Sequence, residues 1–173
     1  MAYARAFGLD VTIVRSVNVY GPRQYLEKVI PLFISHAISG CRLPLYGDGF
    51  QQRSWLYVGD FVDGLMRIAG DPNRRRERNV WHLGSHDEPQ NLELARTICE
   101  LCGADLALIT HVTDRPGHDR RYALDFTETE RVFGWSPQTS MRAGLEATVG
   151  WIKANIEWCR RRTQWKPSFL RGE

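Results

Sequence analysis

Long hydrophobic runs are missing from this sequence of 173 residues. No stretch of about 18 consecutive apolar residues occurs, the length that marks a candidate membrane-spanning helix. The N-terminal segment MAYARAFGLD also lacks the continuous apolar region of a secretory signal peptide. We therefore expect neither a secreted protein nor one with a membrane partner.

Cysteine is sparse, with four residues that form no regular disulfide framework. Cys99 and Cys102 have the spacing of a metal or redox pair, but the surrounding pattern places both inside a helix. No second Cys/His pair has ligand spacing, and no G-x-S-x-G signature of a serine nucleophile occurs. We expect reduced structural thiols, no metal site and a cytoplasmic location.

Lysine is scarce too, because 20 of the 23 basic residues are arginine. The guanidinium group is a planar fork that matches phosphate and carboxylate oxygens, which favours an anionic ligand. Codon bias is the alternative explanation. The net charge is only +3, and we expect no nucleic-acid partner.

The patterns that are present alternate between helix and strand, which predicts an α/β fold in one domain. Strands are predicted at residues 11–17 (buried), 42–46, 54–58, 79–84 and 106–112. Helices are predicted before Gly8 and at residues 29–38, 59–70 (with Asp60 as N-cap), 91–103, 127–134 and 141–162. Residues 74–78 are predicted to form a charged loop, and the tail from Thr163 is expected to be loose.

Four loop segments carry the polar residues: NVYGPRQYLEK, LPLYGDGFQQRSW, SHDEPQN and DRPGHDRRY. Each has a purely structural interpretation. Asn18 could begin a turn, Asn91 could cap a helix, and Arg53 could pair with Asp48 or Asp60. Arg115 and His118 could close a salt-bridged loop.

Taken together, in this order and spacing, these segments resemble the extended short-chain dehydrogenase/reductase family of NAD-dependent epimerases and dehydratases. The likeness runs from about residue 3 to about residue 158, and DRPGHDRRYALD makes it strongest to the dTDP-glucose 4,6-dehydratases. The resemblance implies the end of a Rossmann-like domain together with the smaller substrate-binding domain, as a single unit over residues 1–173.

The resemblance also implies a site for a nucleotide-diphosphate sugar, dTDP-glucose in the best match. Asn18 would touch the sugar or its phosphate, and Lys28 and Val29 would lie along the sugar nucleotide. The remaining implied roles are base contacts by Pro44, Leu45 and Tyr46, a diphosphate grip by Arg53, a nucleotide contact by Asn91, and closure by Arg115 and His118. Arginines from separate loops suit a diphosphate, because they form charge-assisted bonds to phosphate oxygens.

The sequence departs from the family pattern in three places. Val19 stands where the dehydratases usually have a second Asn, Ser54 replaces an acidic residue, and residues 81–85 differ from the usual YNIGG. The Gly-rich turn that receives the NAD pyrophosphate and the catalytic Tyr-x-x-x-Lys pair are missing altogether. We therefore expect the C-terminal half of an enzyme, without catalytic residues and without NAD retention by this chain alone.

Several functions stay open at this point. The first is the sugar-nucleotide-binding half of an NAD-dependent enzyme that dehydrates dTDP-glucose to the 4-keto-6-deoxy sugar. The second is a nucleotide-sugar 4-epimerase or reductase of the same family. The third is a non-catalytic fragment or pseudoenzyme that binds a nucleotide sugar or a partner chain. The expected protein partner is an N-terminal half or a second copy.

Overall fold

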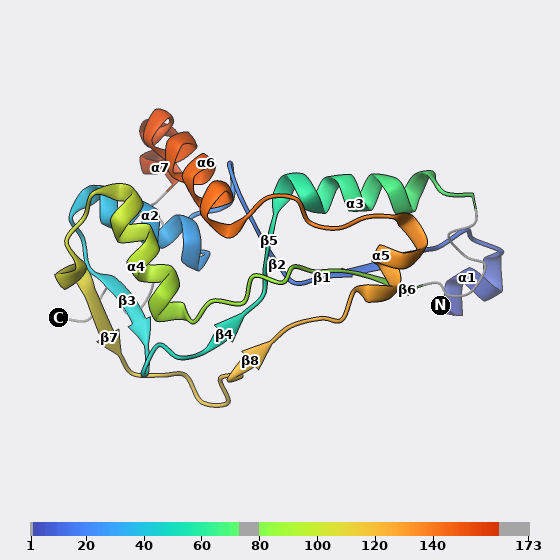
Figure 1. Cartoon of the computed structure of the whole chain (residues 1–173), viewed down its shortest axis with the longest axis horizontal. Helices are drawn as coiled ribbons and strands as arrows, with labels where there is room; N and C mark the ends of the chain where they lie inside the picture. The colour runs from blue at the N-terminus through green and yellow to red at the C-terminus, as the bar shows by residue number, and fades with distance from the viewer. Residues whose placement is uncertain (1, 73–79, 163–173) are drawn as a thin grey trace.

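The structure is a computed structural model that describes residues 2–72 and 80–162 (Figure 1). Its helices are α1 (Ala2–Phe7), α2 (Val29–Ser39), α3 (Val58–Gly70), α4 (Asn91–Cys102), α5 (Thr127–Phe133), α6 (Met141–Ala154) and α7 (Ile156–Arg162), with a 3-10 turn at Leu106–Leu108. Its strands are β1 (Ile13–Ser16), β2 (Asn18–Tyr20), β3 (Leu43–Tyr46), β4 (Gln52–Arg53), β5 (Trp55–Tyr57), β6 (Val80–Leu83), β7 (Ile109–Val112) and β8 (Arg121–Tyr122).

All the described strands pair in parallel, which confirms the α/β class. The pairs are β1 with β6, β2 with β5, β3 with β7, and β4 with β8. The pairs β3–β7 and β4–β8 decide where the polar loops lie. Because β3 leads to β4 and β7 leads to β8, the turn at residues 47–51 and the loop at residues 113–120 lie beside each other.

Two clusters of buried side chains hold these elements together. The larger cluster joins α2, α4 and α6 through residues such as Ile34, Ile98 and Leu145, none of which is exposed. The smaller cluster centres on Trp81 and Trp135 and packs α3 and α5 against β6. Figure 1 shows the two groups of elements at opposite ends of an elongated molecule, with β2 and β5 between them.

The predicted helix boundaries hold where a glycine ends the helix. Gly40 and Gly103 follow α2 and α4 with φ angles of 66° and 70°, a left-handed conformation that glycine adopts without steric cost. The prediction of one helix over residues 141–162 is wrong. Asn155 interrupts it (φ −122°), and its side-chain amide donates to the Trp151 carbonyl, so the side chain competes with the helical backbone.

Asp60 is not the N-cap of α3, because this helix begins at Val58 after the extended Tyr57. The Asp60 carboxylate instead accepts the backbone N–H of Thr139 at 2.9 Å. The predicted strand at 106–112 is shortened by the 3-10 turn at its start. The predictions for residues 74–78 and for the tail from Thr163 lie outside the described residues.

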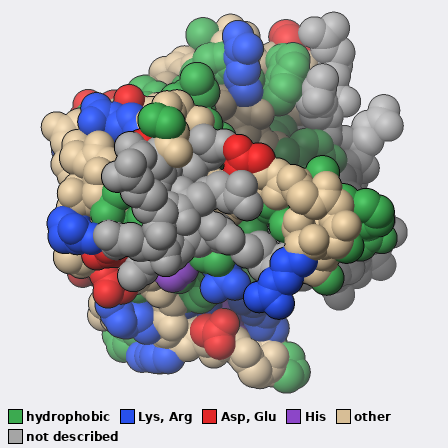
Figure 2. Space-filling model, turned by 90° about the vertical axis from the view of Figure 1, so that its right-hand side faces the viewer, with side chains coloured by type: hydrophobic (Ala, Val, Ile, Leu, Met, Phe, Trp, Pro, Cys, Tyr) green, Lys and Arg blue, Asp and Glu red, His purple; other side chains and the backbone are tan. Residues whose placement is uncertain are grey.

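The strand at residues 11–17 forms, but it is not buried as predicted. Within β1 no residue is fully buried, because its one partner in the described part of the chain is β6. Large apolar side chains are also exposed on α1 and α3, namely Tyr3, Phe7, Val62, Leu65 and Met66. Figure 2 views the end of the molecule that carries α1 in Figure 1, and hydrophobic side chains reach the surface there. No helix in the described residues is long and apolar enough to cross a membrane.

Candidate functional site

One pocket of about 590 Å³ opens between the polar loops. All ten residues that the sequence analysis assigned to a ligand line it: Asn18, Lys28, Val29, Pro44, Leu45, Tyr46, Arg53, Asn91, Arg115 and His118. They come from β2, the start of α2, β3, β4, the start of α4 and the loop after β7. The fold thus brings segments nearly 100 residues apart in sequence into one lining.

Strand pairing places the first part of this lining. Asn18 of β2 lies beside Trp55 of β5 in the parallel register, and both line the pocket. Lys28 forms an ion pair of 2.7 Å with Glu27, which also lines the pocket. The structural interpretation of Asn18 as the start of a turn is wrong, because Asn18 begins a strand.

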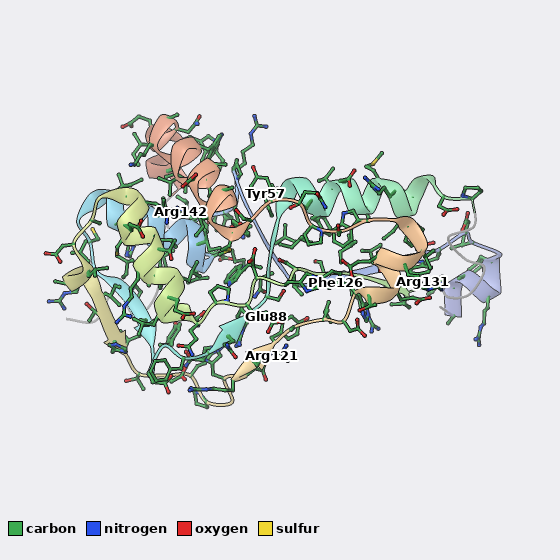
Figure 3. All side chains as sticks on the ribbon, viewed as in Figure 1. Tyr57, Glu88, Arg121, Phe126, Arg131 and Arg142 are labelled. Carbon is green, nitrogen blue, oxygen red and sulfur yellow. The ribbon has the colours of Figure 1, made fainter. Side chains whose placement is uncertain are left out.

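Most of the arginines in the DRPGHDRRY segment have carboxylate partners. Arg120 donates to both oxygens of Asp48, at 3.0 and 2.9 Å. Arg121 makes a bidentate pair with Glu88, at 2.7 and 3.0 Å, and Figure 3 shows the two residues on neighbouring segments. A solvated salt-bridged surface therefore explains these two arginines.

Arg53 and Arg115 differ from that pattern. The guanidinium of Arg53 donates to the backbone carbonyls of Gln52 and Asp119, at 2.7 and 2.8 Å, and neither Asp48 nor Asp60 pairs with it. The guanidinium of Arg115 makes no ion pair or hydrogen bond with any residue in the described ranges 2–72 and 80–162. Both side chains line the pocket, so its wall carries two positive charges without a hydrogen-bonded carboxylate.

The two charges affect each other. Burial lowers the pKa of Arg53 from its usual value, and the nearby positive charge of Arg115 lowers it further, while Asp119 acts in the opposite direction. The effect of Asp119 is larger than that of Arg115, so the protein itself offsets part of the repulsion between the two guanidinium groups. Two guanidinium groups on one wall are groups that form charge-assisted hydrogen bonds to anionic oxygens.

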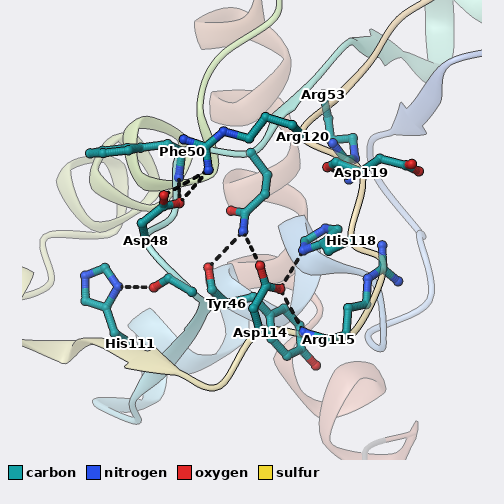
Figure 4. A network of polar contacts seen from close by, with 12 residues as sticks. Tyr46, Asp48, Phe50, Arg53, His111, Asp114, Arg115, His118, Asp119 and Arg120 are labelled. Carbon is teal, nitrogen blue, oxygen red and sulfur yellow. Dashed lines mark hydrogen bonds and ion pairs between the residues drawn. The ribbon is translucent and has the colours of Figure 1, made fainter.

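His118 joins the site through Asp114 (Figure 4). The Nδ1 atom of His118 donates to the Asp114 carboxylate at 2.7 Å, and the Tyr46 ring meets the His118 ring edge-on at 6.2 Å between centroids. The predicted salt-bridged loop thus exists, but its members are Asp114 and His118, and Arg115 is left for the pocket.

Asn91 opens α4 without capping it. The N-cap is Gln90, whose N–H donates to Glu93, and Asn91 uses its own N–H to reach the carbonyl of Gln51. Sequence reasoning missed further lining residues, among them Gln24, Glu27, Phe33 and Trp55. Trp55 could have been predicted to line the pocket, because it lies two residues after Arg53 and side chains two apart in an extended segment face the same side.

The buried tyrosine of β2 is not suited to act as a catalytic base for a sugar hydroxyl. Tyr20 is buried and its hydroxyl donates to the Met141 carbonyl. Burial, with a smaller effect from the Asp87 charge, raises the pKa of Tyr20 far above its usual value. A phenol in that state does not accept a proton at neutral pH.

The described residues contain neither the glycine-rich turn of a dinucleotide site nor a cluster of metal ligands. In the ranges 2–72 and 80–162 no strand runs through a glycine-rich turn into a helix, the arrangement that receives a dinucleotide pyrophosphate. The same ranges hold no group of three or more His, Cys, Asp or Glu side chains that could hold a metal ion. We derive no reaction step through NAD on this chain.

Comparison with known proteins gives this site its context. Residues 1–148 match the family model described as GDP-mannose 4,6 dehydratase. A dTDP-glucose 4,6-dehydratase of an Actinoplanes species is 42% identical over 158 residues, which cover 91% of this chain and 48% of that protein. The dTDP-glucose 4,6-dehydratase 1 of Escherichia coli K12 is 38% identical over 91% of this chain and 45% of its own length.

Solved structures share the fold. The dTDP-glucose 4,6-dehydratase of Streptomyces venezuelae, solved with NAD and TYD bound, has a TM-score of 0.86 and 40% identity, covering 93% of this chain and 49% of that one. The UDP-glucose 4-epimerase of Thermotoga maritima, solved with UDP-glucose, has a TM-score of 0.79 and 29% identity, covering 90% and 50%. The chain spans about half the length of the relatives it matches.

Proposed function

The chain belongs to the GDP-mannose 4,6-dehydratase family of NAD-dependent epimerases and dehydratases, and from this premise we propose that it binds a nucleotide-diphosphate sugar. The best-supported ligand is dTDP-glucose, the substrate named in the relatives at about 40% identity. In this proposal the chain is the substrate-binding half of a dTDP-glucose 4,6-dehydratase-like enzyme.

The observation that carries the proposal is the pair of guanidinium groups in the pocket that have no carboxylate partner among the described residues. Arg53 and Arg115 would bind the diphosphate, because phosphate oxygens supply the anionic acceptors that neither guanidinium has among the described residues. Asn91 and His118, from the walls on either side, would add polar contacts to the nucleotide.

The other assigned lining residues would contact either the base or the sugar. Pro44 and Leu45 are buried in the wall formed by β3, and with Tyr46 they offer an apolar surface for a pyrimidine. Asn18, Lys28 and Val29 lie at β2 and the start of α2, where polar and charged groups would meet the sugar. These assignments follow the family pattern residue by residue.

A nucleotide-sugar 4-epimerase is the second candidate. Two observations favour it: Val19 replaces the second Asn that the dehydratases usually have, and the fold also matches an epimerase solved with UDP-glucose. The two candidates differ in the base and ribose of the preferred ligand, so affinity for dTDP-glucose against UDP-glucose separates them.

Catalysis would need groups that a second polypeptide segment provides, namely the NAD site and a general base. The open edge of β1 and the exposed apolar residues Val62, Leu65 and Met66 on α3 are where we propose that such an N-terminal half docks. An unpaired strand edge and an exposed apolar surface each favour association with another chain. Self-association of this chain is the alternative, and sedimentation of the chain alone and with the N-terminal half of a relative distinguishes the two.

We propose a cytoplasmic location as well, supported by four cysteines that are all free thiols. The experiment for the function as a whole is calorimetric titration of the chain with dTDP-glucose, UDP-glucose and NAD in parallel. We expect saturable binding of dTDP-glucose and none of NAD. Absence of binding by both sugar nucleotides would remove the proposed function.

A further inference from the structure

The carboxylate of Asp114 lies next to Arg115, one of the two arginines proposed to bind the diphosphate. Its negative charge would repel that ligand. Asp114 precedes Arg115 and contacts His118, yet it is not itself a lining residue of the pocket. We propose, resting on the function proposed above, that Asp114 is a positioning residue. Its hydrogen bonds fix the loop that presents Arg115 and His118, and its negative charge is not what the ligand uses.

Asp114 accepts three hydrogen bonds from two separate loops (Figure 4). Its Oδ1 accepts the backbone N–H of Arg115 at 2.8 Å and the Nδ1 of His118 at 2.7 Å. Its Oδ2 accepts the Nε2 of Gln51 at 2.8 Å, from the turn between β3 and β4. One carboxylate therefore orients the start of the loop, its histidine and the neighbouring turn at once.

The surroundings of Asp114 are arranged for this contact. Gln51 is only 2% exposed, and its Nε2 also reaches the Tyr46 carbonyl at 3.3 Å, so the amide is a fixed anchor. Gly47 faces the carboxylate so closely that an added Cβ would lie 2.9 Å from Oδ2 of Asp114. Because Nδ1 of His118 is engaged, the Nε2 atom is the one left for a ligand.

The carboxylate is ionised at neutral pH. The hydrogen bond from His118 is the largest cause that lowers the pKa of Asp114, and the Arg115 backbone and Gln51 lower it further. The negative charge of Asp48 also lies close enough to Asp114 for the two carboxylates to repel each other, an effect smaller than the hydrogen bonds that lower the pKa of Asp48. A full negative charge beside a diphosphate weakens binding, so the value of Asp114 to the site must lie in the geometry it imposes.

Asp48 provides a matched control. It joins the same two loops, through Arg120, but neither residue lines the pocket. Removing the Asp48 carboxylate loosens the loops without touching His118 or the Arg115 backbone. A difference between Asp114 and Asp48 variants therefore separates positioning from general loop stability.

The test is titration of dTDP-glucose into the wild-type chain, D114A, D114N and D48A at pH 7. We expect D114A to bind dTDP-glucose about 10-fold or more weakly, because the donors of Arg115, His118 and Gln51 lose the carboxylate that orients them. We expect D114N to stay within about 3-fold of wild type or to bind more tightly. Its Oδ1 can still accept from Arg115 and His118, and the bond from Gln51 is the one of the three that the new amide nitrogen cannot accept. D48A should also stay within about 3-fold.

Two results would overturn the role of Asp114 alone: D114A binding as well as D48A, or D114N binding as poorly as D114A. A wild-type chain that binds neither dTDP-glucose nor UDP-glucose would overturn the proposed function and this role with it. A second measurement needs no ligand and does not depend on the D114A variant. Carboxyl ¹³C titration should place the pKa of Asp114 below the usual aspartate value in the wild type and raise it in H118N, and an ordinary value in the wild type contradicts the contact.

Discussion

Arg53 and Arg115 are 62 positions apart in sequence, yet they line the same pocket. Burial and, to a smaller extent, the charge of Arg115 lower the pKa of Arg53. Their convergence follows from strand pairing. Arg53 of β4 pairs with Tyr122 of β8, and the loop that carries Arg115 leads directly into β8. Arg53 and Arg115, whose guanidinium groups have no carboxylate partner among the described residues, are thereby brought to one wall, whereas Arg120 and Arg121 pair with acids outside it.

The base preference is the first prediction. We expect dTDP-glucose to bind more tightly than UDP-glucose, because the chain is similar to dTDP-glucose 4,6-dehydratases and β3 offers an apolar wall. The ligands differ by a methyl group and a ribose hydroxyl, and such a group is worth about 1–3 kcal/mol in a fitted pocket. Competitive calorimetry measures the difference. Equal or reversed affinities would favour the epimerase alternative.

The second prediction concerns turnover. Incubated alone with dTDP-glucose and NAD, the chain should form no 4-keto-6-deoxy sugar. The described residues contain no glycine-rich turn for the dinucleotide that accepts the hydride. In the proposed function the general base, a contribution of roughly 10²–10⁴-fold in rate, also comes from the partner segment. The assay is product formation against a no-protein control. Turnover above that control would show that these residues contain a base that the structure does not reveal.

The third prediction concerns the packing of α6 behind the pocket. A Cβ at Gly144 would lie against the hydroxyl of the buried Tyr20, so G144A should destabilise the fold by about 1–3 kcal/mol. The control is G150A in the same helix, where nothing lies within 4 Å of the added carbon. That change should stabilise by about 0.5–1 kcal/mol, since alanine favours helix. Urea unfolding that gives both variants the same sign would contradict this packing.

The fourth prediction concerns acid stability. The backbone N–H of Phe50, and then the Arg120 side chain, lower the pKa of Asp48, and the Thr127 backbone N–H lowers that of Asp125. A carboxyl group with a lowered folded pKa stabilises the fold above its unfolded pKa, near 3.9, and this contribution is lost as pH falls through the folded pKa. We expect the free energy of unfolding to be level from about pH 7 to 5 and to fall below about pH 4. D48N should reduce that slope, and curves parallel to wild type would count against the prediction.

The sequence was a good guide where function depends on order and spacing, and a poorer one where tertiary contacts decide. The ten assigned residues line one pocket, because parallel pairing brings their loops to the same place. That Arg120 and Arg121 are paired while Arg115 is not could not be predicted, since the acids Asp48 and Glu88 are distant in sequence. Asp60 shows the same limit. Local sequence rules predicted a helix cap, but the Asp60 carboxylate accepts a hydrogen bond from the backbone N–H of Thr139, which is distant in sequence.

Short elements were the other difficulty. The two-residue strands β4 and β8 have no periodic pattern, and they form because each supplies the other with hydrogen bonds. Strand β2 was not predicted, because it ends directly before Gly21 and Pro22, a pair that is typical of a turn. The half-burial of β1 depends on which strands lie beside it, and that information is not in the strand itself.

The most direct test of the account compares the arginines of the pocket with their paired neighbours. In titrations with dTDP-glucose, R53A and R115A should each lose about 1.5–3 kcal/mol of affinity, the range for a hydrogen bond to a charged group. R120A and R121A, which remove arginines already paired with Asp48 and Glu88 outside the pocket, should each change affinity by less than about 1 kcal/mol. Unfolding curves confirm that the variants fold. Unchanged affinity in both R53A and R115A, or equal losses in all the variants, would contradict a diphosphate grip by these two residues.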